Sequence, residues 1–241
     1  MQMIHVLLNL SNFDEPWAYG SMENFLNPSS KVLIVPLSYS EGWITDGIEW
    51  KEKYGKGTDG YEEIVRPFRS FGIKDRSIKW INYYEDDETS ARRKIQEADV
   101  LFFTGGYPDW MLQRLYDLGI KEDVQNFDGV MMGASAGAMI QLDEFHLTPQ
   151  EDYEYQYYEG LALIGGFDVE VHYEEDLSHI EAIIRTIEDT GKPVIAMPNE
   201  SGVIIDGQSF ELLGGAFVLG TNELDELYEA YDALKYEYTG Y

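Results

Sequence analysis

The chain has 241 residues, 44% of them hydrophobic, and 45 acidic against 17 basic residues give it a formal charge of −28. This length and composition suit one domain with a single core, spanning residues 1–241. A strongly negative surface repels phosphate groups and anionic headgroups, so we expect neither nucleic acid nor membrane partners. There is no cysteine, which excludes disulfides, thiolate metal sites and cysteine nucleophiles.

The chain contains no run of eighteen apolar residues, and its start lacks the basic and apolar stretches of a secretory signal. We therefore expect a cytoplasmic protein, a monomer or a homodimer, that uses neither metal nor cofactor. The simplest interpretation of the charge is solubility. An alternative is attraction of cationic substrates.

Apolar runs of strand length alternate with longer segments of helical period. This alternation predicts an α/β fold, in which helices flank a mostly parallel sheet in three layers. In the first half of the chain, the predicted elements are strand 4–10, strand 31–37, a broken helix over 45–72, strand 78–83, a helix from Asp87 or Thr89 to Glu97, strand 100–103 and helix 108–118.

The second half continues the alternation and ends in a hairpin and a helix. Its predicted elements are strand 130–132, helix 136–142, strand 145–148, strand 165–173, helix 177–189, strand 193–197, a hairpin of 203–205 with 210–213, and helix 223–234. The stretch 151–159 is acidic and rich in tyrosine, and its side chains would either wall a cleft or cover a sheet edge. We find no repeat and no linker that would mark a second domain.

One segment, Gly133-Ala134-Ser135-Ala136-Gly137, has the Gly-x-Ser-x-Gly pattern of a nucleophile elbow and lies between a predicted strand and a predicted helix. Small neighbours leave room for a sharp turn that projects the hydroxyl of Ser135. The first amides of the helix, that of Ala136 above all, would face negative charge developing on an attacked carbonyl. The alternative is a small-residue turn that only lets a helix pack closely on a strand.

A second glycine pair, Gly105-Gly106, also follows a buried strand and precedes a helix. The carboxyl ends of neighbouring parallel strands meet at one edge of a sheet, so amides of this pair would complete an oxyanion hole. An ordinary turn is the alternative.

A serine nucleophile needs a base, and the chain offers only His5, His146, His172 and His179. His172 ends the apolar run 165–171, which would place it at the same sheet edge as Ser135, so we predict it to be the general base. His146 is as readily explained as a core histidine.

The third member of a triad would be an acid between serine and histidine. Glu151 and Asp152 lie in that interval, although most carboxylates of so acidic a stretch are solvated surface charges. The sequence therefore narrows the acid to this region without selecting one residue.

Several segments together resemble peptidase family S51, which contains the aspartyl dipeptidases called dipeptidase E and the cyanophycinases. These segments are residues 101–106, 133–138, 160–163 leading to His172, 196–200, 203–205 and 213–215. The resemblance spans about residues 30–220 and implies a flavodoxin-like fold similar to class I glutamine amidotransferases. It also implies a serine peptidase for small peptides that acts by a Ser-His-acid mechanism through an acyl-enzyme. In that mechanism Ser135 is the nucleophile, His172 the base, and Gly106 and Ala136 provide the oxyanion amides.

The chain departs from the family pattern at three places. Family members usually have asparagine after the glycine pair, where this chain has Tyr107. The acid position of dipeptidase E falls on Gln150, directly before Glu151 and Asp152. The arginine associated with aspartate recognition would lie near His179, and the nearest arginine is Arg185.

Two other functions fit parts of the pattern. An α/β-hydrolase-type esterase shares the elbow, but it usually has its histidine in a late loop, and no histidine follows His179. A non-catalytic member of the same fold would use the cleft to bind a peptide or metabolite. Glutamine amidotransferase activity is excluded, because those enzymes use a cysteine at the elbow.

Overall fold

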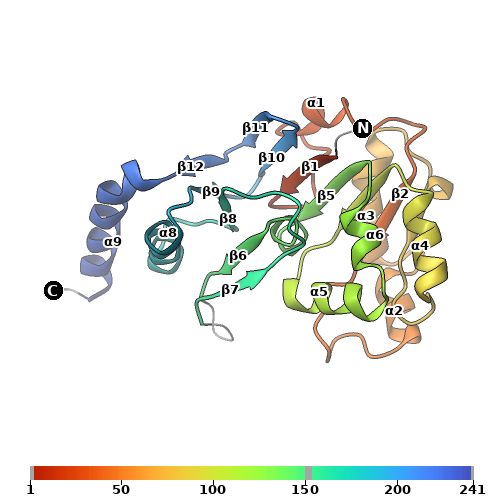
Figure 1. Cartoon of the computed structure of the whole chain (residues 1–241). Coiled ribbons are helices and arrows are strands. Elements are labelled where there is room, and N and C mark those ends of the chain that lie inside the picture. Colours follow the sequence, from red (N-terminus) through yellow and green to blue (C-terminus); the bar gives the residue numbers. More distant parts are fainter. Residues whose placement is uncertain (1–2, 150–153, 240–241) are drawn as a thin grey trace.

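A seven-stranded sheet organises the computed structural model, which describes residues 3–149 and 154–239 (Figure 1). Its strands lie in the order β11 (Ser209–Gly214), β10 (Ser201–Asp206), β1 (Ile4–Leu8), β5 (Val130–Ala134), β4 (Val100–Phe103), β2 (Val32–Val35) and β3 (Ile78–Trp80). The run from β1 to β3 is parallel throughout, whereas β10 pairs antiparallel with β1 and with β11. The predicted mostly parallel sheet is therefore confirmed.

Helices cover both faces of this sheet, which gives the three predicted layers. Along β2, Val32 and Ile34 face one core while Leu33 and Val35 face the other. The first core is closed by α1 (Tyr19–Met22), α2 (Gly47–Tyr54) and α3 (Asp59–Ser70). The second is closed by α4 (Glu88–Gln96), α5 (Pro108–Asp117), α6 (Lys121–Gln125) and α7 (Ala136–Met139). Strands covered on both faces are continuously apolar, as β2 and β4 are.

Two smaller sheets and two further helices are built from residues that come after β5 in the chain. The order β12 (Phe217–Leu219), β9 (Val194–Met197), β8 (Asp168–Val171) forms one small sheet, and β6 (Glu144–Leu147) with β7 (Gln156–Glu159) forms the other. The predicted strand 165–173 is β8, so it does not extend the main sheet as expected. It pairs with β9 instead, because β10 and β11 already occupy that edge of the main sheet.

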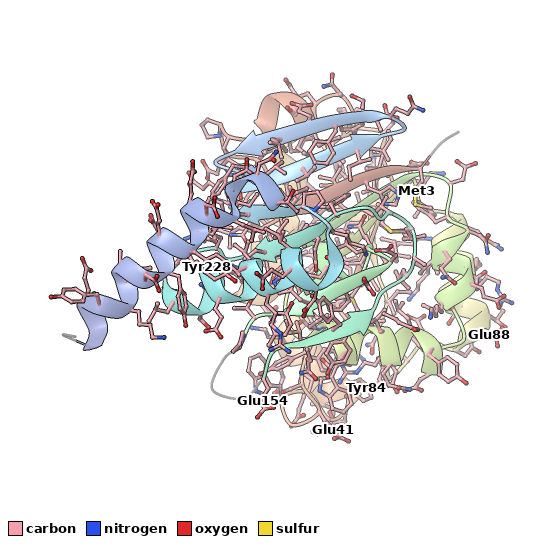
Figure 2. The ribbon with its side chains drawn as sticks, turned by 60° about the vertical axis from the view of Figure 1, so that its left-hand side comes forward. Met3, Glu41, Tyr84, Glu88, Glu154 and Tyr228 are labelled. Atoms are coloured by element: carbon pink, nitrogen blue, oxygen red, sulfur yellow. The ribbon has the colours of Figure 1, made fainter. Side chains whose placement is uncertain are left out.

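The two last helices, α8 (Leu177–Thr190) and α9 (Leu224–Thr239), pack on each other through a separate apolar cluster that includes Ile183 and Leu227. Figure 2 shows Tyr228 on α9, and its hydroxyl donates to Glu188 Oε1 of α8 at 2.7 Å. Within the described residues, we find no helix with the length and apolar character needed to cross a membrane.

Candidate active site

The serine turn has a backbone conformation that few residues adopt. Strand β5 ends at Ala134, Ser135 has φ 52°, and α7 begins at Ala136. A non-glycine residue at positive φ is uncommon, and such strain concentrates at functional sites. The amide of Ser135 donates to Leu8 O of β1 at 2.8 Å, which fixes the turn against the neighbouring strand.

Close packing explains the two outer glycines of the turn. A Cβ at Gly133 would lie 1.9 Å from Gly137 O, and one at Gly137 would lie 2.3 Å from Phe103 O of β4. No side chain fits at either position without moving backbone. The turn thus lets α7 pack closely on β4 and β5, and it also presents a serine, so the two interpretations of the motif coexist.

Ser135 and His172 lie side by side. His172 Nε2 lies 2.9 Å from Ser135 Oγ, although the two residues come from different sheets. His172 directly follows β8 and also has a positive φ, of 56°. The structure therefore brings together the serine and histidine chosen from the sequence, by a route other than the shared sheet edge.

A buried asparagine holds the backbone of His172. Asn9 follows β1, is 1% exposed, and accepts the amide hydrogen of His172 at Oδ1 over 2.7 Å. Its Nδ2 donates to Pro198 O at 3.0 Å, which ties the same residue to the end of β9. No sequence pattern pointed to Asn9, because its partners lie far away in the chain.

The charge state of His172 favours the role of a base. Desolvation of the ring lowers the pKa of His172 below the ordinary 6.5, the charge of His179 lowers it further, and Glu170 opposes both. At neutral pH the imidazole is therefore unprotonated and able to accept a proton from a hydroxyl. Glu170 is the described carboxylate that acts on this ring by charge.

The glycine pair lies against the serine turn, as predicted. A Cβ at Gly105 would lie 3.3 Å from the Ser135 Cβ, and Gly106 has φ +136° with its missing Cβ 2.4 Å from Ser38 O. Ala136 is the first residue of α7, so its amide has no carbonyl partner within the helix. Gly105, Gly106 and Ser135 therefore lie together at the carboxyl ends of β4 and β5.

Arg114 of α5 fixes the segment that supports this pair. Its side chain is 5% exposed, donates from Nη1 to Leu37 O and Tyr39 O at 2.6 and 2.5 Å, and lies over the Tyr39 ring. Between those carbonyls, Ser38 O accepts the amide hydrogen of Tyr107 at 2.6 Å, and the Ser38 hydroxyl donates to the carbonyl of Gly105. A buried cation thus braces the glycine pair, a role that helical periodicity does not reveal.

Two hollows each include the serine and the histidine in their lining. One, of about 530 Å³, is lined by Ser135, His172, Gly106, Tyr107 and Pro108 and extends over further residues of β6, β8 and α8. The other, of about 430 Å³, shares Ser135, His172 and Gly106 and continues past Asn9, Asn12 and Arg66. Tyr107, the residue that differs from the family pattern, thus forms part of the first wall.

Behind the first hollow lies a buried ion cluster centred on His146. Its Nδ1 lies 2.9 Å from Asp168 Oδ2 and its Nε2 lies 2.5 Å from Glu170 Oε2, and all three side chains are at most 2% exposed. Burial alone would lower the pKa of His146, but the charges and hydrogen bonds of Asp168 and Glu170 raise it to about 10. His146 is therefore a protonated core histidine, one of the two alternatives left open by the sequence.

The remaining sequence candidates fall elsewhere. Gln150, Glu151 and Asp152 lie outside the described residues. Arg185 lies 4.1 Å from the Tyr155 ring centre and 3.5 Å from Asp189 Oδ2, and it is not one of the described residues that line the first hollow. Among the described residues, no group of three or more histidines and carboxylates has the arrangement of a metal site.

Two solved structures of peptidases have a fold similar to that of this chain. A search of curated proteins found no match. Among solved structures, a candidate peptidase E from Listeria monocytogenes EGD-e is 16% identical with a TM-score of 0.61, covering 88% of this chain and 98% of its own. A peptidase from an acI-B1 Actinobacterium is 14% identical with a TM-score of 0.58, covering 91% of this chain and 95% of its own. At such identities these two structures show a common fold.

The family itself is shown by sequence. The model of peptidase family S51 matches residues 57–213, which is more than half of the chain and contains the glycine pair, the serine turn and His172. The α/β-hydrolase interpretation is therefore set aside. The chain belongs to peptidase family S51 and is a serine-type peptidase.

Proposed function

We propose that the protein hydrolyses dipeptides or other small peptides through an acyl-enzyme, with Ser135 as nucleophile and His172 as general base. The observation that carries the proposal is the 2.9 Å separation of Ser135 Oγ and His172 Nε2 at a strained turn. Family membership supports peptide hydrolysis, and the two hollows beside the hydroxyl support a short substrate. We also propose that the enzyme works in the cytoplasm, without metal or cofactor.

The proposed reaction has two halves. His172 takes the hydroxyl proton as Ser135 Oγ bonds to the substrate carbonyl carbon, and the carbonyl oxygen becomes an oxyanion near the amides of Gly106 and Ala136. The C–N bond then breaks and the leaving amine receives the proton from His172. In the second half His172 takes a proton from water as the water oxygen bonds to the ester carbon. The bond between that carbon and Ser135 Oγ then breaks, Oγ receives the proton from His172, and the peptide acid leaves. Each amide donor of such a hole typically contributes about 3 to 4 kcal/mol.

We propose that the acid that orients His172 is Glu151 or Asp152. Among the described residues, Glu170 lies two positions before His172 and opposes the fall in its pKa. It is engaged with His146, so we assign it no hydrogen bond to His172.

A fluorophosphonate probe tests the assignment of nucleophile and base. We expect mass spectrometry to locate the adduct on Ser135, Ser135→Ala to abolish labelling, and His172→Gln to slow it by about 10²- to 10⁴-fold. Ser77→Ala is the matched control. Ser77 directly precedes β3, at the amino ends of the parallel strands, whereas Ser135 follows β5 at their carboxyl ends. If the folded native protein is never labelled, the proposed serine mechanism is refuted and a peptide-binding role is favoured.

The pH dependence of kcat/KM gives an independent test of His172. Its pKa is lowered, so activity should rise with pH to half its maximum below pH 6.5. His179→Gln removes a like charge and should move this midpoint upward, whereas Glu170→Gln removes an opposite charge and should move it downward. Shifts in the same direction for both variants would contradict the assignment.

A further inference from the structure

The hollow of about 530 Å³ beside Ser135 has an acidic floor. Glu170 is the carboxylate among its described lining residues, and those residues include neither lysine nor arginine. Asp168 lies directly behind, joined to Glu170 through His146. Glu170 and Asp168 are each 2% exposed, so little water screens them.

The charges on this floor do not cancel. Asp168 and Glu170 carry two negative charges and share one protonated imidazole, that of His146, which leaves one negative charge. His179, which also lines the hollow, lies 3.0 Å from Asp176 Oδ1, so its charge is offset by that carboxylate and the group as a whole stays negative. A cationic group in the hollow would be attracted, and a carboxylate group would be repelled.

Glu170 still has room for a further donor. Its Oε2 is engaged by His146, while Oε1 accepts the hydroxyl hydrogen of Thr148 at 2.6 Å and lies 3.7 Å from His179 Nε2. A carboxylate has about four acceptor positions, so Oε1 can accept a hydrogen bond from an ammonium or guanidinium group.

The walls suit the hydrocarbon stem of a long basic side chain. Met139, Leu147 and Val171 line the same hollow as Ser135 and Glu170. Lysine and arginine side chains pack such stems on apolar surface while a polar partner holds the charged end.

We propose that this hollow is the subsite for a cationic group of the peptide substrate, a lysine or arginine side chain, with Glu170 as its acceptor. The proposal rests on the proposed peptidase function and names its substrate class. A substrate's α-ammonium group has the same chemistry, and the experiment separates the two sources.

The test compares lysine with norleucine, which has a similar length and no charge. We would measure kcat/KM for Xaa-Ala and Ala-Xaa peptides with Xaa as lysine, norleucine or aspartate, each free and N-acetylated. At one of the two positions, lysine should exceed norleucine by about tenfold or more, the value of one charged hydrogen bond. If the α-ammonium group is the bound cation, acetylation instead lowers every value by a similar factor.

Variants of Glu170 and Thr148 test whether the acidic floor causes the preference for lysine. Glu170→Gln removes the charge, and Thr148→Lys places a tethered ammonium beside Glu170, so each should bring the lysine-to-norleucine ratio towards one. Thr148→Val loses only a hydroxyl and should keep the ratio, as should Glu188→Gln on α8. Because the ratio compares two peptides on one protein, any effect of Glu170 on His172 cancels. If Glu170→Gln fails to fold, Thr148→Lys still decides.

Three results would overturn the proposal. They are equal rates for lysine and norleucine with no effect of acetylation, a preference for aspartate, and a lysine-to-norleucine ratio that is unchanged in both Glu170→Gln and Thr148→Lys. If no peptide is hydrolysed, binding to Ser135→Ala is measured by calorimetry. Tighter binding of the lysine peptide than of the norleucine peptide would then support the subsite while the proposed function fails. Equal binding, or none, would overturn the subsite as well.

Discussion

Ser135→Ala and His172→Ala are each expected to lower kcat/KM by about 10⁴- to 10⁶-fold, and the double variant should lose no more than the larger single loss. The hydroxyl and the imidazole act as one unit, since His172 Nε2 lies 2.9 Å from the atom whose proton it is to take. Once either is gone, the other contributes nothing to attack. Residual hydrolysis would come from binding and the backbone amides.

The measurement is steady-state kinetics of all four proteins on one peptide, after circular dichroism has shown that each is folded. Ser77→Ala should retain native activity. Losses that multiply in the double variant would mean that the two residues act independently. A Ser135→Ala protein with native kcat would end the proposed mechanism.

The serine turn could be predicted because every residue that makes it is contiguous. Gly133 and Gly137 are small since backbone lies within 2.3 Å of where a Cβ would be, and Ser135 stands between a strand and a helix that both show in the sequence. The glycine pair Gly105-Gly106 could be predicted for the same reason, because it also stands between a strand and a helix that show in the sequence. The parallel sheet was predictable from its continuously apolar strands.

His172 shows where such reasoning stops. An apolar run predicts a strand and does not say which sheet that strand joins. The proximity of His172 to Ser135 was therefore predicted, whereas the prediction that β8 belongs to the main sheet was wrong. Asn9 and Arg114 were missed because their contacts join segments 163 and 77 residues apart. The helices α1 and α6 and the strand β12 were also missed, because they are too short to show a period.

The buried ion cluster of His146, Asp168 and Glu170 is expected to make a large contribution to stability. His146→Gln is expected to lower the free energy of unfolding at pH 7 by about 3 to 5 kcal/mol, the usual result of removing one partner from a buried ion pair. Glutamine can still donate a hydrogen bond, but it leaves Asp168 and Glu170, each 2% exposed, without a cation.

The sign of the pH dependence follows from the direction of the pKa shift. The pKa of His146 is about 10 in the folded chain against an ordinary 6.5, so the folded state binds the proton more tightly. The stabilisation is therefore complete below pH 6.5 and is lost as pH rises through about 10. The difference in stability between native protein and His146→Gln should accordingly shrink over that range.

Urea unfolding of both proteins between pH 6 and pH 10 measures this difference. His5→Gln is the matched control, because His5 is also buried but bonds Gln141 and has a lowered pKa. Its stabilisation belongs to the neutral ring, so its difference from the native protein should not decline towards pH 10. A His146→Gln protein as stable as the native one at pH 7, or a difference that grows with pH, would mean that His146 is not the cation that holds these two carboxylates.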